Sequence, residues 1–478
     1  EVAQAFGSFW MLRRPLGALL GFRRAASMAA APTWEELRQR VCSTPTGAQL
    51  VKEDQERAQG YGPPHRASTL RLFDSKSAES VRVTLYRDSA AWCPYCQKLW
   101  ILLEEKRIPY RVELINMRSY GEKPKSFLAK CPRGLLPAVE LDGKLYTESL
   151  DIMAMLDQAF EGPEHRKLLP PPKTAAWERL QQLLQLERAL FSAWCSYVFR
   201  PGVSGRAQFE QTLQAVEAAL GDEPGVPWFL SFTDGPSLVD LQYVSHVERM
   251  AASVPYWKGH AIRGSGEYPN LDRWFKAFEL RPAYVATKSD WYTHVKDIPP
   301  QYGPGVAIPQ AAETMAALDG GDAAWRLPLP PLATSTAPSD ILQPGWETFE
   351  AGAAHEAAYR VVTNSAAVSR FMARGAGTPG GWSHGRPDRA ELADPGAKPA
   401  TGAVAEEVDA ALRAAVAVLV DGAVPNAGHK QLLQGVRYSR EIVACAEYLR
   451  DRVGVPRDMS YPAARCLRGA LNWVAASL

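Results

Sequence analysis

Residues 81–106, "VRVTLYRDSAAWCPYCQKLWILLEEK", decide the fold because a strand pattern runs directly into a helix pattern. Residues 81–87 alternate apolar and polar side chains, which predicts a strand. From Cys96 onward, Leu and Ile recur at helical spacing with charged residues between them, which predicts a helix. Cys93 and Cys96 therefore lie at the junction of the two elements.

Three kinds of site contain such a Cys-x-x-Cys pair: a metal site, a structural disulfide and a reactive thiol. Zinc takes about four ligands, but the chain has no second Cys-x-x-Cys, and His65, the nearest histidine in sequence, is isolated. The seven cysteines are sparse and odd in number, which favours a reducing compartment over a secreted disulfide scaffold. We therefore expect no metal and interpret the pair as a working thiol site.

The start of the helix explains which thiol reacts. Pro94 at the first helical position places Cys93 at the N-cap. Free amides and the positive end of the helix dipole stabilise a thiolate there. Cys96, one turn further on, can attack a mixed disulfide formed on Cys93. We predict that Cys93 is the nucleophile and Cys96 a resolving thiol, and leave open whether Cys96 is needed.

The chain after this stretch continues as an α/β unit. The segment 110–117 predicts a second strand and 124–131 a second helix. The segment 137–149 reads as two strands joined by the turn pair Asp142-Gly143, and a third helix begins at Ser149. The order is strand, helix, strand, helix, strand, strand, helix.

Composition and spacing divide the 478 residues into more than one domain, since one ordinary core does not serve so long a chain. Thr33 and Glu36 have the spacing of a capping box, which predicts a helix near the N-terminus. The segments that we expect are a transit peptide (1–31), an N-terminal helical extension (32–80), an α/β domain (81–161), an all-helical domain (174–298), a Pro/Ala-rich linker (299–345) and a C-terminal helical extension (346–478).

Charge and hydropathy argue against two classes of partner. The 54 basic and 52 acidic residues nearly cancel, so we expect no nucleic acid. No run of about 18 apolar residues occurs, so we expect no membrane span. The leader, in contrast, carries four arginines and no acid over 11–31, "MLRRPLGALLGFRRAASMAAA", which is typical of an organellar transit peptide. Its composition does not separate plastid from mitochondrion.

Several separated motifs together resemble a known family. Residues 81–161 resemble the thioredoxin-fold N-terminal domain of glutathione transferases, and 174–298 resemble their helical C-terminal domain. The "CPYC" motif is that of dithiol glutaredoxins, and a cysteine at this site resembles the omega and dehydroascorbate-reductase-like classes. The resemblance implies an α/β plus all-α fold with an additional helical block, a thiol-transfer enzyme, and glutathione as co-substrate.

The resemblance also implies five glutathione-binding residues. Pro137 would be the family's cis-proline, and Leu136 before it would offer its backbone N–H and C=O to the cysteinyl part of glutathione. Lys130 matches a lysine that pairs with a glutathione carboxylate, and Glu148 and Ser149 match the pair that holds the γ-glutamyl end. From the residues alone, Lys130 fits a solvated helix-end lysine equally well, and Ser149 could be a simple N-cap.

Two functions remain open. The first is glutathione-dependent thiol transfer, either deglutathionylation of a small-molecule or protein disulfide or the reduction of dehydroascorbate. The second is a non-catalytic scaffold that docks through its extension, in a homodimer or a larger organellar assembly. Residues 346–478 look like the tail of longer glutathione-transferase-like proteins of cyanobacteria and algae, which favours the plastid stroma. We expect this block to pack on the transferase portion of its own chain or of a dimer mate. A cut near residue 320 should leave the thiol chemistry intact but lower the solubility or thermal stability.

Overall fold

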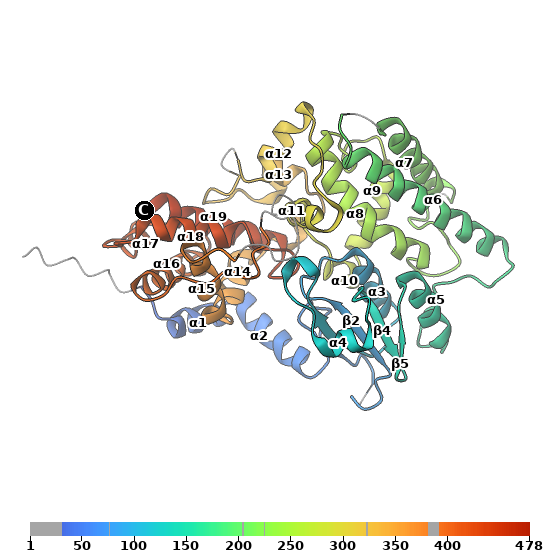
Figure 1. The fold of residues 1–478 in the computed structure, drawn as a ribbon, viewed down its shortest axis with the longest axis horizontal. Helices are drawn as coiled ribbons and strands as arrows, with labels where there is room; N and C mark the ends of the chain where they lie inside the picture. Colours follow the sequence, from blue (N-terminus) through green and yellow to red (C-terminus); the bar gives the residue numbers. More distant parts are fainter. Residues whose placement is uncertain (1–30, 76, 203–204, 224, 322–323, 381–391) are drawn as a thin grey trace, which may run out of the picture.

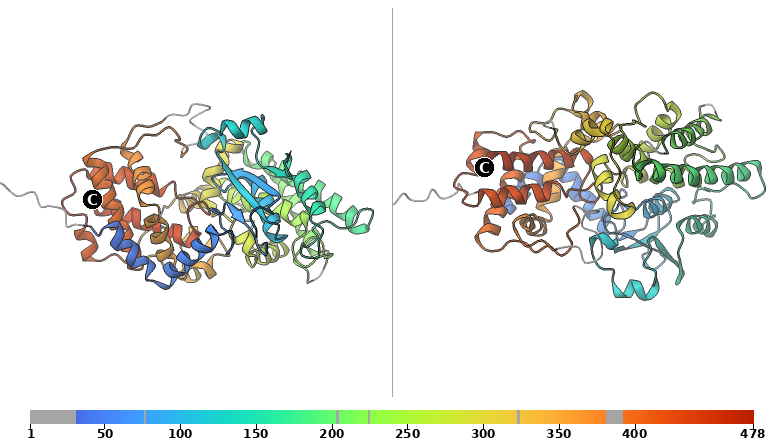
Figure 2. Two further views of the ribbon diagram at one scale, coloured as in Figure 1. Left: turned by 90° about the horizontal axis from the view of Figure 1, so that it is seen from below. Right: turned by 45° about the horizontal axis from the view of Figure 1, so that its top comes forward.

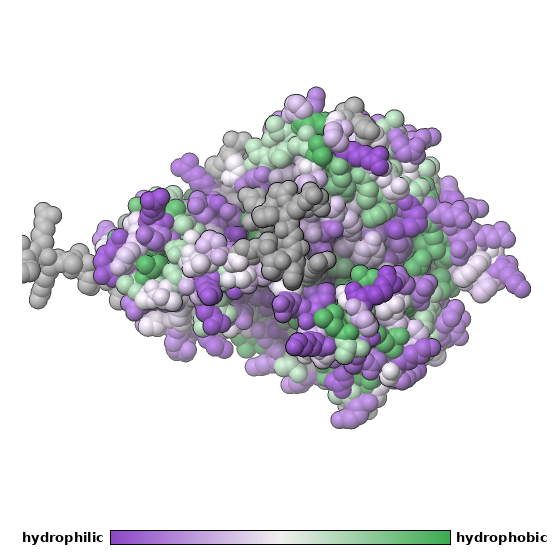
Figure 3. Space-filling model, viewed as in Figure 1, coloured by the Kyte–Doolittle hydropathy of each residue, from purple (hydrophilic) through white to green (hydrophobic). Residues whose placement is uncertain are grey.

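The computed structural model describes residues 31–75, 77–202, 205–223, 225–321, 324–380 and 392–478. The predicted transit peptide, apart from Ala31, lies outside these residues. Among the helices that are described, none combines the length and apolarity needed to cross a bilayer. On the face shown in Figure 3, hydrophilic residues alternate with small apolar areas.

A five-stranded mixed sheet forms the first domain, with the strand order β1-β3-β2-β4-β5. Its strands are β1 (Leu70–Arg71), β2 (Val83–Asp88), β3 (Tyr110–Ile115), β4 (Ala138–Leu141) and β5 (Lys144–Tyr146). The central strand β2 runs parallel to β3 and antiparallel to β4. The end of β2 and the beginning of β4 therefore meet at one edge of the sheet, with Tyr86 opposite Ala138.

The helices of this domain follow the predicted order. They are α3 (Pro94–Glu105), α4 (Lys125–Lys130) and α5 (Ser149–Ala159). The expected hairpin connects β4 to β5, and Asp142 and Gly143 both have positive φ angles, as such a turn requires. The N-terminal segment that we expected to be helical also supplies β1, which pairs with β3.

The second domain is entirely helical and packs against the first in one continuous core that runs from Val83 to Leu318. Its helices are α6 (Ala175–Val198), α7 (Arg206–Gly221), α8 (Leu238–Lys258), α9 (Pro269–Glu279), α10 (Pro282–Val285) and α11 (Trp291–Tyr302). Every residue of α8 is buried, so this helix forms the centre of the domain (Figure 1). The last helix, α11, continues through two prolines to Tyr302, past the expected boundary at 298.

A second hydrophobic core joins the two ends of the chain. The N-terminal helices α1 (Trp34–Cys42) and α2 (Pro45–Ala58) pack on the C-terminal helices, which are α14 (Ala353–Val362), α15 (Ser365–Met372), α16 (Ala403–Val420), α17 (Ala427–Gln431), α18 (Ser439–Arg450) and α19 (Tyr461–Ser477). Trp34 Nε1 donates a hydrogen bond of 2.9 Å to Asp409 of α16. Figure 2 shows the blue N-terminal helices against the orange and red ones. We call these eight helices the terminal body.

The segment expected as a linker contains short helices and buried side chains. Its helices are α12 (Ala312–Leu318) and α13 (Pro338–Ile341). Trp325 is buried, and Asp340 forms a buried ion pair of 2.6 Å with Arg465 of α19. The linker is therefore packed along the protein over these residues.

The terminal body also packs on the helical domain of its own chain, which confirms that expectation. Arg468 Nη1 of α19 lies 2.9 Å from Asp290 Oδ2, and both side chains are fully buried. The amide of Val455 donates to the Thr293 hydroxyl at 3.1 Å. The contact thus falls on the beginning of α11.

Candidate active site

The loop between β2 and α3 is fixed by a buried carboxylate. Asp88, the last residue of β2, accepts hydrogen bonds on Oδ2 from the amides of Trp92 (2.7 Å) and Cys93 (3.1 Å). Cys93 is the N-cap of α3, and Pro94 is its first helical residue, as predicted. The Cys93 side chain makes no capping hydrogen bond, so the sulfur is not committed to closing the helix end.

The two thiols differ in their surroundings. Both are free, and Cys93 is 9% exposed whereas Cys96 is 1% exposed. Burial, together with the hydrogen bond to Cys93, raises the pKa of Cys96 well above its usual value. Cys96 therefore stays protonated at neutral pH, which leaves Cys93 as the thiol at the positive end of the helix.

Asp88, Cys93 and Cys96 also form a group that has to be tested as a metal site. Their ligand atoms lie within 4.8 Å of one another. Three ligands are one fewer than a structural zinc site needs. The Asp88 oxygen that accepts both loop amides already has a structural role. We assign Asp88 the role of holding the loop. No sequence motif pointed to this residue, although it lies only five positions before Cys93.

The helical domain holds the same loop from the other side. Trp92 donates its indole N–H to His294 Nδ1 at 3.1 Å, and His294 Nε2 lies 2.8 Å from Glu248. Arg249 donates to the Trp92 carbonyl and, at 2.8 Å, to the Gln97 side chain. Burial lowers the pKa of His294, so the ring is neutral and carries its proton on Nε2, facing Glu248.

Glu248 remains charged in this network. Burial works against ionisation, but the hydrogen bond from His294 and the nearby Arg249 lower the pKa of Glu248 to about 2. These partners lie more than 100 positions from the Cys-x-x-Cys motif in sequence, and no local spacing pointed to them.

An aromatic and cationic group faces the thiol site from the helical domain. Tyr95 of α3 packs edge-on against His246, with ring centroids 5.2 Å apart. Tyr302, at the end of α11, hydrogen-bonds to Tyr95. Arg188 of α6 has a side chain that is 52% exposed and lies over the Phe191 ring, 4.9 Å from its centroid. Of the aromatic run on α6, Trp194 and Tyr197 are buried in the core.

The expected cis-proline lies at the same edge of the sheet as the cysteines. The peptide bond between Leu136 and Pro137 is cis, as the resemblance implied. Pro137 directly precedes β4, whose first residue pairs with Tyr86 of β2. Leu136 is half-buried, and Pro137 is buried.

Glu148 and Ser149 lie at the beginning of α5. Glu148 is the N-cap and Ser149 the first helical residue, so Ser149 is not the N-cap itself. Glu148 is exposed, has a φ of +67°, and its carboxylate lies 3.5 Å from Arg133. Left-handed backbone at a residue other than glycine is strained and is found preferentially at functional sites.

Lys130 is placed differently from the other predicted residues. Its ammonium donates to Glu140 at 2.8 Å and to the Tyr86 hydroxyl at 2.7 Å, and these bonds raise the pKa of Lys130. Lys130 is therefore paired with two side chains of the sheet, and its predicted contact with a glutathione carboxylate stays a prediction. Lys123, a cation that the sequence motifs did not indicate, donates to the Asn116 carbonyl at 2.7 Å; burial lowers its pKa, and charge on Cys96 or Cys93 would raise it.

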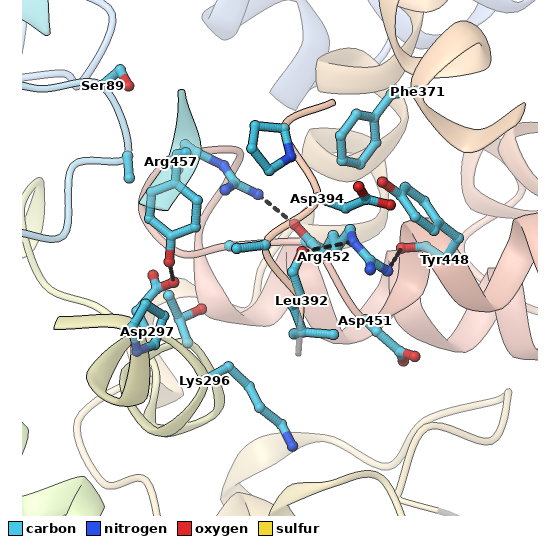
Figure 4. A pocket seen from close by; sticks show the side chains of 18 of the residues that line it. Ser89, Lys296, Asp297, Phe371, Leu392, Asp394, Tyr448, Asp451, Arg452 and Arg457 are labelled. Carbon is cyan, nitrogen blue, oxygen red and sulfur yellow. Dashed lines mark hydrogen bonds between the residues drawn. The ribbon is translucent and has the colours of Figure 1, made fainter. Parts of the chain in front are cut away.

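A cavity of about 210 Å³ lies close to the thiol loop, between the sheet domain, α11 and the terminal body. Figure 4 shows it, with Ser89 from the loop on one side and Arg452 and Arg457 on the other. Tyr120 donates to Asp297 of α11 there, and burial raises the pKa of Asp297 to about 6. Cys93 does not line this cavity.

Comparison with known proteins agrees with the fold. Residues 92–159 match the family model "Glutathione S-transferase, N-terminal domain", and 172–277 match "Glutathione S-transferase, C-terminal domain". "Glutathione S-transferase DHAR2" of Arabidopsis thaliana is 38% identical over 201 residues, which are 41% of this chain and 84% of that protein. "Protein IN2-1 homolog A" of Oryza sativa subsp. japonica is 30% identical over 200 residues, 42% of this chain and 78% of that protein.

Among solved structures, glutathione transferase Omega 3C from Trametes versicolor is 25% identical, with a TM-score of 0.38 over 50% of this chain and 90% of its own. The predicted fold class, a thioredoxin-like domain followed by a helical domain and further C-terminal helices, is confirmed. The sequence matches, the sheet topology and the thiol at the start of α3 together show that the chain belongs to the glutathione S-transferase family.

Proposed function

We propose that the protein is a glutathione-dependent thiol transferase whose nucleophile is Cys93. The observation that carries the proposal is the position of Cys93 at the N-terminus of α3, with its sulfur free of any capping bond. A hydroxyl at this position would activate glutathione for attack on electrophiles, whereas a thiolate attacks disulfides itself. The family relationship supports glutathione as the co-substrate.

The reaction consists of two disulfide exchanges. The Cys93 thiolate attacks the glutathione sulfur of a mixed disulfide, the old S–S bond breaks, and the other sulfur leaves as a thiolate that takes a proton from water. A second glutathione, as thiolate, then attacks the glutathione sulfur bound to Cys93. This step releases glutathione disulfide and regenerates the Cys93 thiolate.

Cys96 is not required in this scheme. Its raised pKa keeps it protonated, and a thiol reacts far more slowly than a thiolate. In this scheme free glutathione resolves the intermediate. Dehydroascorbate remains the alternative oxidised substrate for the same thiol.

The first domain supplies the residues that we assign to glutathione. The free amides at the start of α5 and the Ser149 hydroxyl would hold the γ-glutamyl carboxylate, and Glu148 its ammonium group. Leu136, before the cis-proline Pro137, would pair with the cysteinyl part through its backbone. A role for Lys130 toward a glutathione carboxylate would require it to leave Glu140.

The test is an activity panel on the purified full-length protein with glutathione. Its oxidised substrates are a small glutathione mixed disulfide and dehydroascorbate, set against a chlorinated aromatic electrophile. Cys93→Ser should abolish reduction, and Cys96→Ser should retain much of it. Cys42→Ser, on α1 in the terminal body, is the matched control. Full activity in Cys93→Ser would rule out the proposal.

A scaffold role is the second candidate, and the terminal body with its own core is the observation that favours it. A scaffold would show no glutathione-dependent reduction in any arm of the panel. A plastid location, a homodimer and a larger organellar assembly stay predictions from the sequence.

A further inference from the structure

A second cavity, of about 470 Å³, lies outside the residues that match the family models. It lies within the terminal body, where α14, α15, α18 and α19 meet the loop that connects α2 to β1. Its volume is in the range of small-molecule pockets. Neither cysteine of the thiol site lines it, so it is distinct from that site, although Arg452 and Arg457 also line the cavity of about 210 Å³ described above.

One wall of this cavity is apolar. Val361, Leu449, Met459 and Leu467 line it and are each no more than 6% exposed. Val368 of α15 also lines the cavity and is half-buried. These side chains offer a hydrocarbon surface to whatever occupies the space.

Cationic side chains line the same cavity. Arg66, Arg360, Arg452 and Arg457 line the cavity, and Asp458 is the single acidic residue among its lining. Asp458 is already paired with Arg457 at 2.8 Å. Arg452 donates to the main-chain carbonyls of Leu392 and Tyr448, and among the described residues it has no carboxylate at ion-pair distance.

Arg66 and Arg360 have the weakest partners. In the part of the chain that the structure describes, the Arg66 guanidinium has no hydrogen bond and no carboxylate at ion-pair distance, and its Nε is buried. Arg360 is 12% exposed and its ion pairs are long, 3.7 Å from Nη1 to Asp54 and 4.0 Å from Nε to Glu356, and its buried Nε has no hydrogen bond among the described residues. Buried donors without partners are costly, and an anion between these two side chains would remove that cost.

The local electrostatics agree with this geometry. Burial lowers the pKa of Arg66 to about 10, and although Asp458 opposes the shift, the neighbouring Arg360 and Arg457 add to it. Burial and then the charge of Arg360 also lower the pKa of His65 to about 2. The site therefore holds an excess of positive charge.

We propose that this cavity binds an amphiphilic organic anion, with its acidic head between Arg66 and Arg360 and its apolar chain against the wall formed by Val361, Leu449 and Met459. The head satisfies the unpartnered guanidinium donors, and the chain takes the apolar wall out of water. Neither half of the ligand alone would fill both requirements.

The test is calorimetric titration of the full-length protein with octanoate, which has both features. 1-Octanol, which has the chain without the charge, and inorganic phosphate, which has the charge without the chain, are the matched ligands. Octanoate should bind at least about tenfold more tightly than either. Equal binding of octanol or of phosphate, or no binding of octanoate, would overturn the proposal.

Two variants locate the site. Arg66→Gln should weaken octanoate binding by about tenfold or more, and Val368→Trp should block it by filling the cavity. Arg440→Gln, at an exposed arginine of α18, is the matched control and should bind as the wild type does. Unchanged octanoate affinity in Arg66→Gln would place the ligand elsewhere.

A stability measurement separates a binding arginine from a structural one. Since Arg66 forms no side-chain hydrogen bond or ion pair with the residues that the structure describes, Arg66→Gln should keep or raise the melting temperature of the free protein. A structural arginine would lower it on substitution. A clear fall in melting temperature would therefore overturn the assignment of Arg66 to a ligand.

Discussion

The two hydrophobic cores of this protein are assembled in different ways. The core around the thiol site follows the chain from Val83 to Leu318, so neighbouring elements pack on one another. The core of the terminal body joins α1 and α2 to helices that begin at Ala353. The N-terminal helices α1 and α2 therefore bury their apolar faces against helices at the other end of the chain. The C-terminal helices in turn do not form their core without α1 and α2.

Helix α11 connects the two cores. On one side, His294 accepts the indole hydrogen bond of Trp92, the residue before Cys93. On the other side, Asp290 and Thr293 contact the terminal body. Helix α11 therefore connects the terminal body to the thiol loop.

The largest effect should follow from removing the C-terminal helices by a cut near residue 320. Helices α1 and α2 would lose their core, and α11 would lose the partner of Asp290. We expect poor solubility, unfolding of α1 and α2, and reduced activity at Cys93, in place of the intact chemistry expected from the sequence. Hydrogen exchange and the activity panel measure these effects. A truncated protein with full activity and protected α1 amides would show that the N-terminal helices do not depend on the C-terminal ones.

The ion pair between the two cores should be the most sensitive single contact. Arg468→Ala leaves Asp290 buried without its partner, which typically costs about 3–5 kcal/mol. Denaturant unfolding measures the loss. Arg450→Ala, on α18 with a side chain that is 21% exposed, is the control and should cost far less. Equal losses of unfolding free energy in both variants would show that the ion pair between Arg468 and Asp290 contributes no more to stability than the ion pairs of Arg450.

The stability of the protein should also depend on pH through Asp297 of α11. Its pKa of about 6 in the folded protein lies above the usual 3.8, so its contribution to stability is present below pH 4 and is lost as pH rises through 6. Asp297→Asn should therefore match the wild type near pH 4 and be more stable at pH 7, by about 2–3 kcal/mol from the size of the shift. The same difference in unfolding free energy between Asp297→Asn and the wild type at both pH values would contradict the raised pKa of Asp297.

The smallest of these effects should be confined to the first core. If Ser149 binds glutathione as proposed, Ser149→Ala would remove a charge-assisted contact worth about 1.5–3 kcal/mol and should raise the KM for glutathione without changing the melting temperature. Because the proposed contact is to glutathione and not to the thiol, Cys93 should react with a small alkylating agent as in the wild type. An unchanged KM would return Ser149 to a purely structural role.

Turns and helix ends of this protein could be predicted from the sequence alone. Pro94 after Cys93, the turn pair Asp142-Gly143, and the capping box of Thr33 and Glu36 are all found where their spacing predicted them. Each depends on a few neighbouring residues, whose backbone preferences and short-range hydrogen bonds are the same in any fold. The resemblance carried by separated motifs then supplied the domain order.

Only the tertiary structure decided which distant groups meet. It brought Asp88, His294 and Arg249 to the thiol loop, paired Lys130 with Glu140, and closed the terminal body around α1. An apolar helix face shows that a partner exists, but its spacing does not say which other face covers it. That choice is made by the packing of the whole chain, since only there do buried charges and apolar faces find the partners that offset the cost of burying them.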